Sequence, residues 1–179
     1  DTVDEPTSPK ADALNGELSL ATDLDSCLDK SLIHEMVVAE ENAGLLVLVR
    51  LLREELDRYT QNATQTDDAD TGANASVPQP RVVIFFPNED MAQAAISPLR
   101  DALWGRHNVG VLLPTIGFNP LTIMEQFKNS ELSVLLATPT SVRGLDFEGL
   151  THVYTMYLPA DDPREYIHLA GRVGRAGQL

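Results

Sequence analysis

The sequence predicts an α/β protein with a mainly parallel central sheet and helices on both of its faces. Two observations lead to this fold class. Residues 81–86 (RVVIFF) form a short, continuously apolar run, which is typical of a buried parallel strand. After this run, strand-like and helix-like segments alternate, and that order predicts βαβ units in a sheet covered by helices.

The segments before residue 81 predict one strand and one helix. Residues 32–39 (LIHEMVVA) are rich in apolar and β-branched residues, so we expect a strand. Residues 42–59 follow with leucines and valines at helical spacing, which predicts an amphipathic helix. Glu40 and Glu41 precede this helix, and negative charge stabilises a helix N-terminus.

The alternation after residue 86 gives the remaining elements. Asn88 stands where a helix N-cap belongs, and Glu89 and Asp90 follow it. We therefore expect a helix whose buried face contains Ala92, Ala95, Ile96 and Leu99. Further strands are predicted over residues 109–113, 133–137 and 152–157, and further helices over residues 121–127 and 163–170.

Charge is distributed unevenly along the 179 residues, whose net charge is −14. Residues 1–80 hold 17 acidic and 5 basic residues, whereas residues 81–179 hold 10 and 8. The acidic half therefore does not count against a nucleic-acid site in the second half. Residues 1–30 are predicted to be a largely disordered acidic segment, and residues 61–80 a flexible insertion in a domain spanning residues 31–179.

Several classes of protein are disfavoured. No apolar stretch is long enough to span a bilayer, and the first residues do not resemble a signal peptide, so we expect an intracellular protein that is not secreted and has no membrane partner. Cys27 is the single cysteine, which excludes an intrachain disulfide and a cysteine-based zinc site. No residue is assigned to metal binding.

Two segments stand where ligands bind in such sheets, beyond the carboxyl ends of strands or after the last helix. They are residues 137–146 (ATPTSVRGLD) and residues 168–177 (HLAGRVGRAG). Arg172 and Arg175 are three residues apart, so in near-helical backbone they project to the same side. Their guanidinium groups match phosphate oxygens, and the neighbouring glycines permit close backbone approach.

These two segments resemble motifs V and VI of the C-terminal helicase domain of DEAD-box RNA helicases. The first is similar to A-T-D-x-x-x-R-G-L-D and the second to H-R-x-G-R-x-x-R-x-G, and the order and spacing of the segments also match. The resemblance covers roughly residues 31–179. It implies a RecA-like, P-loop NTPase-like domain with three layers, which forms half of an ATP-dependent RNA helicase.

The resemblance also implies roles for single residues. Arg172 and Arg175 are the expected catalytic arginines, which reach the γ-phosphate of ATP held with Mg²⁺ mainly by an N-terminal RecA-like domain. Nucleotide contacts are implied for Arg143, Gly144 and Asp146, RNA contacts for Asn88 and Thr138, and an interdomain role for His168. The implied partners are that N-terminal domain, RNA as a single strand or short duplex, and a protein cofactor as a further candidate.

Ordinary structural roles remain as alternatives for these residues. Two arginines near a chain end are often a solvated surface, and an aspartate after glycine and leucine often caps a turn. Thr138 is as easily a structural residue as an RNA contact. His168 is also compatible with a packed helix histidine.

The sequence departs from the family pattern at several positions. Pro139 replaces an aspartate, Leu169 replaces an arginine that bridges to other motifs, and Tyr157 replaces a common aspartate. Gly117 and Pro120 fall where a Q-x-x-R element normally contacts RNA. Most of these changes affect RNA binding or interdomain coupling, so we expect the nucleotide side of the site to be better retained.

The chain contains no G-x-x-x-x-G-K-[ST] loop and no D-E-A-D tetrapeptide, so the isolated chain is expected to be inactive. We expect it to be a fragment of a longer helicase whose final strand and helix of this domain are missing, leaving a sheet edge open. Two rival hypotheses stay open. The first is a degenerate helicase-like domain that acts as a non-catalytic interaction module in an RNA–protein assembly. The second is a helicase of the wider superfamily that acts on DNA.

Overall fold

The computed structural model describes residues 32–66, 79–116, 119–157 and 163–173. Its strands are β1 (Val82–Phe85), β2 (Val109–Leu112), β3 (Val134–Ala137) and β4 (His152–Thr155). Its helices are α2 (Gly44–Thr66), α3 (Glu89–Ala102), α4 (Pro120–Lys128) and α5 (Pro163–Ala170). Two short 3₁₀ helices are η1 (Glu41–Ala43) and η2 (Pro114–Ile116).

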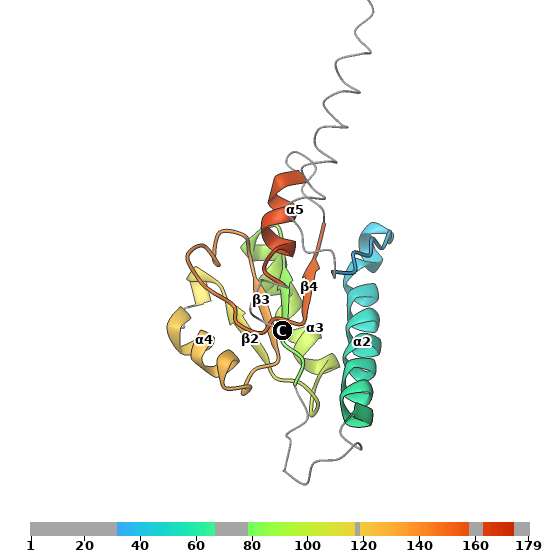
Figure 1. The fold of residues 1–179 in the computed structure, drawn as a ribbon. Coiled ribbons are helices and arrows are strands. Elements are labelled where there is room, and N and C mark those ends of the chain that lie inside the picture. The colour runs from blue at the N-terminus through green and yellow to red at the C-terminus, as the bar shows by residue number, and fades with distance from the viewer. Residues whose placement is uncertain (1–31, 67–78, 117–118, 158–162, 174–179) are drawn as a thin grey trace, which may run out of the picture.

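The four strands form one sheet in the order β2-β3-β1-β4, and every pair of neighbours is parallel. Phe85 lies opposite both Ala137 and Thr155, and Ala137 also lies opposite Leu112. The carboxyl ends of all four strands therefore meet at one edge of the sheet, near the α5 label in Figure 1. The predicted α/β class with a parallel sheet is confirmed.

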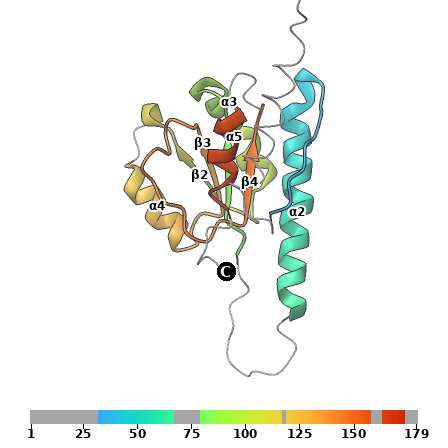
Figure 2. The same cartoon turned by 45° about the horizontal axis from the view of Figure 1, so that its top comes forward.

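Helices cover both faces of this sheet, as predicted (Figures 1 and 2). Alternate side chains of β1 explain why: Val82 and Ile84 enter one core cluster, and Val83 and Phe85 enter the other. The first cluster includes the apolar faces of α2 and α3, and the second includes those of α4 and α5. Strands β1, β2 and β3 are buried on both faces of the sheet, which is why their sequences are continuously apolar.

The helix starts predicted from local signals are confirmed. Asn88 caps α3, where its Oδ1 accepts a hydrogen bond from the Met91 N–H at 2.9 Å. Ala92, Ala95 and Leu99 are the buried residues of this helix, while Ile96 packs half-buried against the same cluster. Every other strand and α-helix described after residue 80 agrees with its predicted range to within two residues, whereas the 3₁₀ helix η2 was not predicted.

The predicted strand over residues 32–39 is wrong. These residues have no regular secondary structure, and Ile33 and Val38 are 88% and 86% exposed. A strand needs a neighbour for its backbone hydrogen bonds, and none of the described strands pairs with this segment. β-Propensity reflects packing on a sheet, so the apolar composition alone did not determine the conformation.

The beginning of the predicted insertion over residues 61–80 is also wrong. Helix α2 continues without a break from Gln61 to Thr66. Once a helix is nucleated by a packed apolar face, each added residue gains a hydrogen bond, so polar residues can extend it. The rest of that prediction, over residues 67–78, and the predicted disordered segment over residues 1–30 lie outside the described residues.

Within the described ranges, no helix has both the length and the apolar character needed to cross a lipid bilayer.

Candidate functional site

The candidate site lies where the sheet ends and its connections begin. The loop of residues 138–150 leaves the carboxyl end of β3 and crosses the α4 and α5 side of the sheet before reaching β4. Val142, Phe147 and Leu150 of this 138–150 loop are buried in the same core cluster as Leu169 of α5. The loop is therefore anchored to the domain by apolar contacts, and its charged residues Arg143, Asp146 and Glu148 lie between these anchors in the sequence.

Thr138 is the first residue of the loop, and it begins a turn that hydrogen bonds with Ser141 hold together. Its side chain is only 1% exposed, and its Oγ1 accepts a hydrogen bond from the Ser141 N–H at 3.2 Å. The Thr138 N–H donates to Ser141 Oγ at 2.9 Å, and the Ser141 hydroxyl donates to the Thr138 carbonyl at 3.0 Å. The hydroxyl of Thr138 thus stabilises the turn, and its RNA contact stays a prediction that this burial does not favour.

The three residues predicted to contact nucleotide lie further along the loop. Arg143 and Asp146 are exposed. Gly144 has a φ of 77°, in the left-handed region that favours glycine, and nothing lies within 4 Å of the position that a Cβ would occupy. The backbone at Gly144 is therefore open to close approach by a ligand.

Arg172 joins the second motif to this loop. Its Nη1 donates a hydrogen bond to the Leu145 carbonyl at 2.8 Å, and its guanidinium carbon lies 5.6 Å from the centroid of the Phe147 ring. The structure therefore places Arg172 beside the loop segment that contains Arg143, Gly144 and Asp146, and their nucleotide contacts stay predictions. Gly174, Arg175 and Gly177 lie outside the described residues, so the predicted role of Arg175 stays a prediction.

Helix α5 positions His168 and Leu169 differently. His168 is exposed, which keeps it available for its predicted interdomain role. Leu169, which stands in the position of the family's bridging arginine, is 4% exposed and packs in the core. This leucine fastens α5 to its own domain.

Asn88 also stands at the carboxyl edge, just beyond β1. Its side chain is exposed, and its Oδ1 is used to cap α3. The predicted RNA contact by Asn88 therefore involves a residue that already has a structural partner.

Asp146 borders a small hollow between the 138–150 loop and α4. The hollow has a volume of about 210 Å³ and is lined by Met124, Glu125, Phe127, Lys128, Asp146 and Glu148. Lys128 Nζ and Glu148 Oε2 form an ion pair of 3.1 Å at its border. Across the described segments, no three His, Cys, Asp or Glu side chains are grouped so that they could hold a metal ion.

Sequence reasoning missed two contributors to this site. Phe147 is buried beneath Arg172, and the Leu145 carbonyl accepts its hydrogen bond. A backbone carbonyl carries no sequence signal, because every residue has one. The position of Phe147 directly after the Arg-Gly-Leu-Asp segment is a signal that could have indicated this residue.

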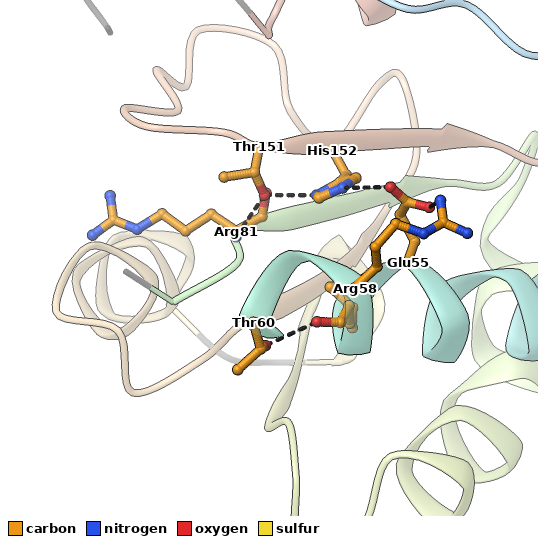
Figure 3. A network of polar contacts seen from close by, with 7 residues as sticks. Glu55, Arg58, Thr60, Arg81, Thr151 and His152 are labelled. Carbon is orange, nitrogen blue, oxygen red and sulfur yellow. Dashed lines mark hydrogen bonds and ion pairs between the residues drawn. The ribbon is translucent and has the colours of Figure 1, made fainter. Parts of the chain in front are cut away.

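A separate polar network lies at the amino end of β4 (Figure 3). The Thr151 hydroxyl donates to the Arg81 carbonyl at 3.0 Å and contacts His152 Nδ1 at 2.8 Å. On its other side, His152 Nε2 lies 3.9 Å from Glu55 Oε1 of α2. Burial lowers the pKa of His152 below its ordinary value of 6.5, and the Glu55 carboxylate opposes this shift only in part. The network fastens α2 to the sheet, away from the carboxyl edge.

Comparisons with known proteins identify the class of this domain. The model of the helicase conserved C-terminal domain matches residues 74–177, and the chain therefore belongs to this family. The matched range includes the 138–150 loop and both arginines of the second motif.

Its relatives are DEAD-box and related ATP-dependent RNA helicases. The ATP-dependent RNA helicase CshA of Limosilactobacillus reuteri is 54% identical over 55 residues, which are 31% of this chain and 11% of that protein. The ATP-dependent RNA helicase RhlB of Shewanella amazonensis is 47% identical over 73 residues, which are 40% of this chain and 16% of that protein. The matched part of the chain thus spans only a small fraction of the length of these relatives.

Solved structures support the fold. Domain 2 of the DEAD-box helicase Mss116p, bound to an RNA duplex, gives a TM-score of 0.57 at 17% identity, over 76% of this chain and 47% of that chain. The Escherichia coli DEAD-box protein SrmB, bound to regulator of ribonuclease activity A, gives 0.52 at 19% identity, over 78% and 68% of the two chains. The chain has the RecA-like fold of a helicase C-terminal domain.

Proposed function

We propose that this chain is the C-terminal motor domain of a DEAD-box ATP-dependent RNA helicase, which remodels RNA duplexes or RNA–protein complexes. The observation that carries the proposal is the 2.8 Å hydrogen bond from Arg172 to the Leu145 carbonyl. It unites the two motif segments of a helicase C-terminal domain at the carboxyl edge of a parallel sheet, where such sheets bind ligands. The names of the relatives support the same activity.

In this proposal the ATPase site is shared with an N-terminal RecA-like domain, which holds most of the ATP and the Mg²⁺. Magnesium neutralises charge on the phosphates when it is bound there. Arg172 and Arg175 stabilise the charge that develops on the transferred phosphoryl group, since guanidinium groups make strong paired hydrogen bonds to phosphate oxygens. Arg143, Asp146 and the open backbone at Gly144 bind the nucleotide from the 138–150 loop.

RNA is the proposed second ligand of the same edge. Domain 2 of Mss116p is bound to an RNA duplex in its solved structure. In this chain the side chains of Asn88 and Thr138 already have intramolecular partners, so we expect RNA contacts there to rely more on exposed surface and backbone groups than on the Thr138 hydroxyl.

The decisive experiment uses the full-length protein that carries this domain. Replacing Arg175→Ala is expected to lower RNA-stimulated ATP hydrolysis by about 10³-fold or more, because an arginine at the transferred phosphate contributes on this scale. Arg53→Ala is the matched control, because Arg53 is an exposed arginine on α2 and its loss should leave the rate unchanged. Wild-type protein without any RNA-stimulated ATPase would exclude the enzyme. The 179-residue chain alone is expected not to hydrolyse ATP.

A non-catalytic interaction module is the second candidate. Burial of Leu169 favours it, because this residue takes the position of an arginine that otherwise bridges to other motifs. The structure of SrmB bound to regulator of ribonuclease activity A shows a DEAD-box protein with a protein partner. Under this alternative, Arg175→Ala changes no activity, because none exists. Comparing RNA with DNA as stimulators of ATP hydrolysis distinguishes an RNA helicase from a helicase that acts on DNA.

A further inference from the structure

Phe147 occupies an unusual position for a core residue. Its side chain is only 1% exposed, yet the guanidinium carbon of Arg172 lies 5.6 Å from the centroid of its ring. A cation over a shielded aromatic ring is attracted more strongly than one at an exposed site. The ring therefore contacts both the apolar core and the charged group of the candidate site.

The ring itself is held by its surroundings. Phe127 of α4 meets Phe147 edge to face, with 6.4 Å between the ring centroids and an angle of 79° between their planes. Phe127 is also buried, and both rings belong to the cluster that contains Val142 and Leu169. A ring packed in this way cannot turn freely, so it offers Arg172 a fixed surface.

Arg172 is fixed from a second direction as well. Its Nη1 donates to the Leu145 carbonyl at 2.8 Å, two residues before Phe147 in the same loop. Leu169, buried one helical turn before Arg172, anchors the end of α5 that leads into the arginine. Ring, carbonyl and anchored helix together restrict the conformations of a long side chain that would otherwise lose about 2 kcal/mol of rotamer entropy on binding.

We propose that Phe147 is a positioning residue for ATP hydrolysis. It holds the Arg172 side chain against the 138–150 loop before nucleotide binds. The inference rests on the proposed function, because it assigns Phe147 a role through the arginine of that ATPase site. Ordering the Arg172 side chain in advance removes part of the entropy loss from the catalytic step, since the arginine is ordered while the protein folds. Phe147 itself contacts no substrate in this role.

The positioning of Arg172 by Phe147 can be tested in the nucleotide-free 179-residue chain, with a measurement that does not depend on ATPase activity. The Arg172 Nε–H resonance, identified by its loss in Arg172→Lys, should show a ring-current shift that disappears in Phe147→Leu. Phe86→Leu is the matched control, because Phe86 is also buried but belongs to the core cluster on the opposite face of the sheet. An Arg172 resonance that is the same in Phe147→Leu and in wild type would overturn the proposed positioning of Arg172 by Phe147.

The consequence for catalysis is measured in the full-length protein. Phe147→Leu is expected to lower kcat for RNA-stimulated ATP hydrolysis about five-fold, the scale of one cation–π contact, and to change KM for ATP less than two-fold. In an Arg172→Lys background, Phe147→Leu should have less than half of this effect, since residues that act as a unit are not additive. Phe86→Leu should leave kcat unchanged at an equal folded fraction, checked by circular dichroism.

The outcomes separate the two proposals. Equal losses of kcat in Phe147→Leu and Phe86→Leu, or an undiminished effect of Phe147→Leu in the Arg172→Lys background, would mean that Phe147 acts only through the core. Wild-type protein with RNA-stimulated ATPase activity but without the resonance shift would overturn the positioning of Arg172 by Phe147 and leave the proposed function intact. Wild-type protein without RNA-stimulated ATPase would overturn the proposed function, and the catalytic role of Phe147 with it, even when the shift is present.

Discussion

At the scale of single residues, Asn88 combines a structural contact with a position at the candidate site. Its Oδ1 accepts the Met91 N–H at 2.9 Å, which satisfies one of the donors at the start of α3. Asn88→Ala should therefore lower the free energy of unfolding by about 1 kcal/mol. Urea denaturation of the 179-residue chain measures this difference.

Asn88→Ser is the control for the cap, because serine also accepts this hydrogen bond. We expect its stability to remain within about 0.5 kcal/mol of wild type. Equal destabilisation by serine and alanine would contradict the capping role. If the serine variant keeps its stability and binds RNA more weakly, the predicted RNA contact of Asn88 gains support.

His152 couples the packing of α2 on β4 to pH. Burial lowers its pKa in the folded protein, while the unfolded value is near 6.5. A lowered pKa means that the unfolded chain binds the proton more readily, so protonation favours unfolding. The stability that neutral His152 contributes is therefore fully present above about pH 6.5 and is lost as the pH falls from there through the lowered pKa.

The groups around His152 set the expected result. Glu55 with its ion-pair partner Arg58 faces it from α2, Tyr59 meets its ring edge to face, and Thr151 contacts its Nδ1. His152→Gln should reduce the loss of thermal stability between about pH 7.5 and about pH 5.5. Some loss should remain, because burial also lowers the pKa of His107. Equal pH dependence in wild type and His152→Gln would refute the prediction.

At the scale of secondary-structure elements, helix α3 contains an internal proline. Pro98 is exposed and lies ten residues into the helix, where it has no N–H to donate to the Ala94 carbonyl. Pro98→Ala should raise the free energy of unfolding by about 2 kcal/mol, the cost of an interior proline less its effect on the unfolded chain. Chemical denaturation tests this, with the adjacent exposed Ser97→Ala as a control expected to change stability by less than about 0.5 kcal/mol. A Pro98→Ala variant less stable than wild type would show that the proline is favourable here.

The elements also show which sequence signals were sufficient. The start of α3 was predicted, because a cap and an apolar face are local features. The end of α2 was not, because residues 61–66 contain no apolar face and only the packed part of the helix made their extension favourable. The segment of residues 32–39 failed as a strand, since its conformation depends on a neighbour that its own sequence does not specify.

At the scale of the whole molecule, one contact links the start of the described chain to α5. His34 Nδ1 and the Tyr166 hydroxyl are 2.7 Å apart, and their rings meet edge to face with 5.9 Å between centroids. These residues are 132 positions apart, so no local pattern indicates the pair. The contact joins the irregular segment of residues 32–40 to the helix that leads into Arg172.

The sequence by itself determined the α/β class, most element positions and the two segments that form the candidate site. These follow from local periodicity, caps and motif spacing, which act between residues close together in the chain. Only the tertiary structure decided the strand order β2-β3-β1-β4 and the contacts of Arg172 with the Leu145 carbonyl and the Phe147 ring. Such contacts depend on which distant segments pack together and on backbone groups that every residue shares, so the sequence pattern of either segment alone cannot specify them.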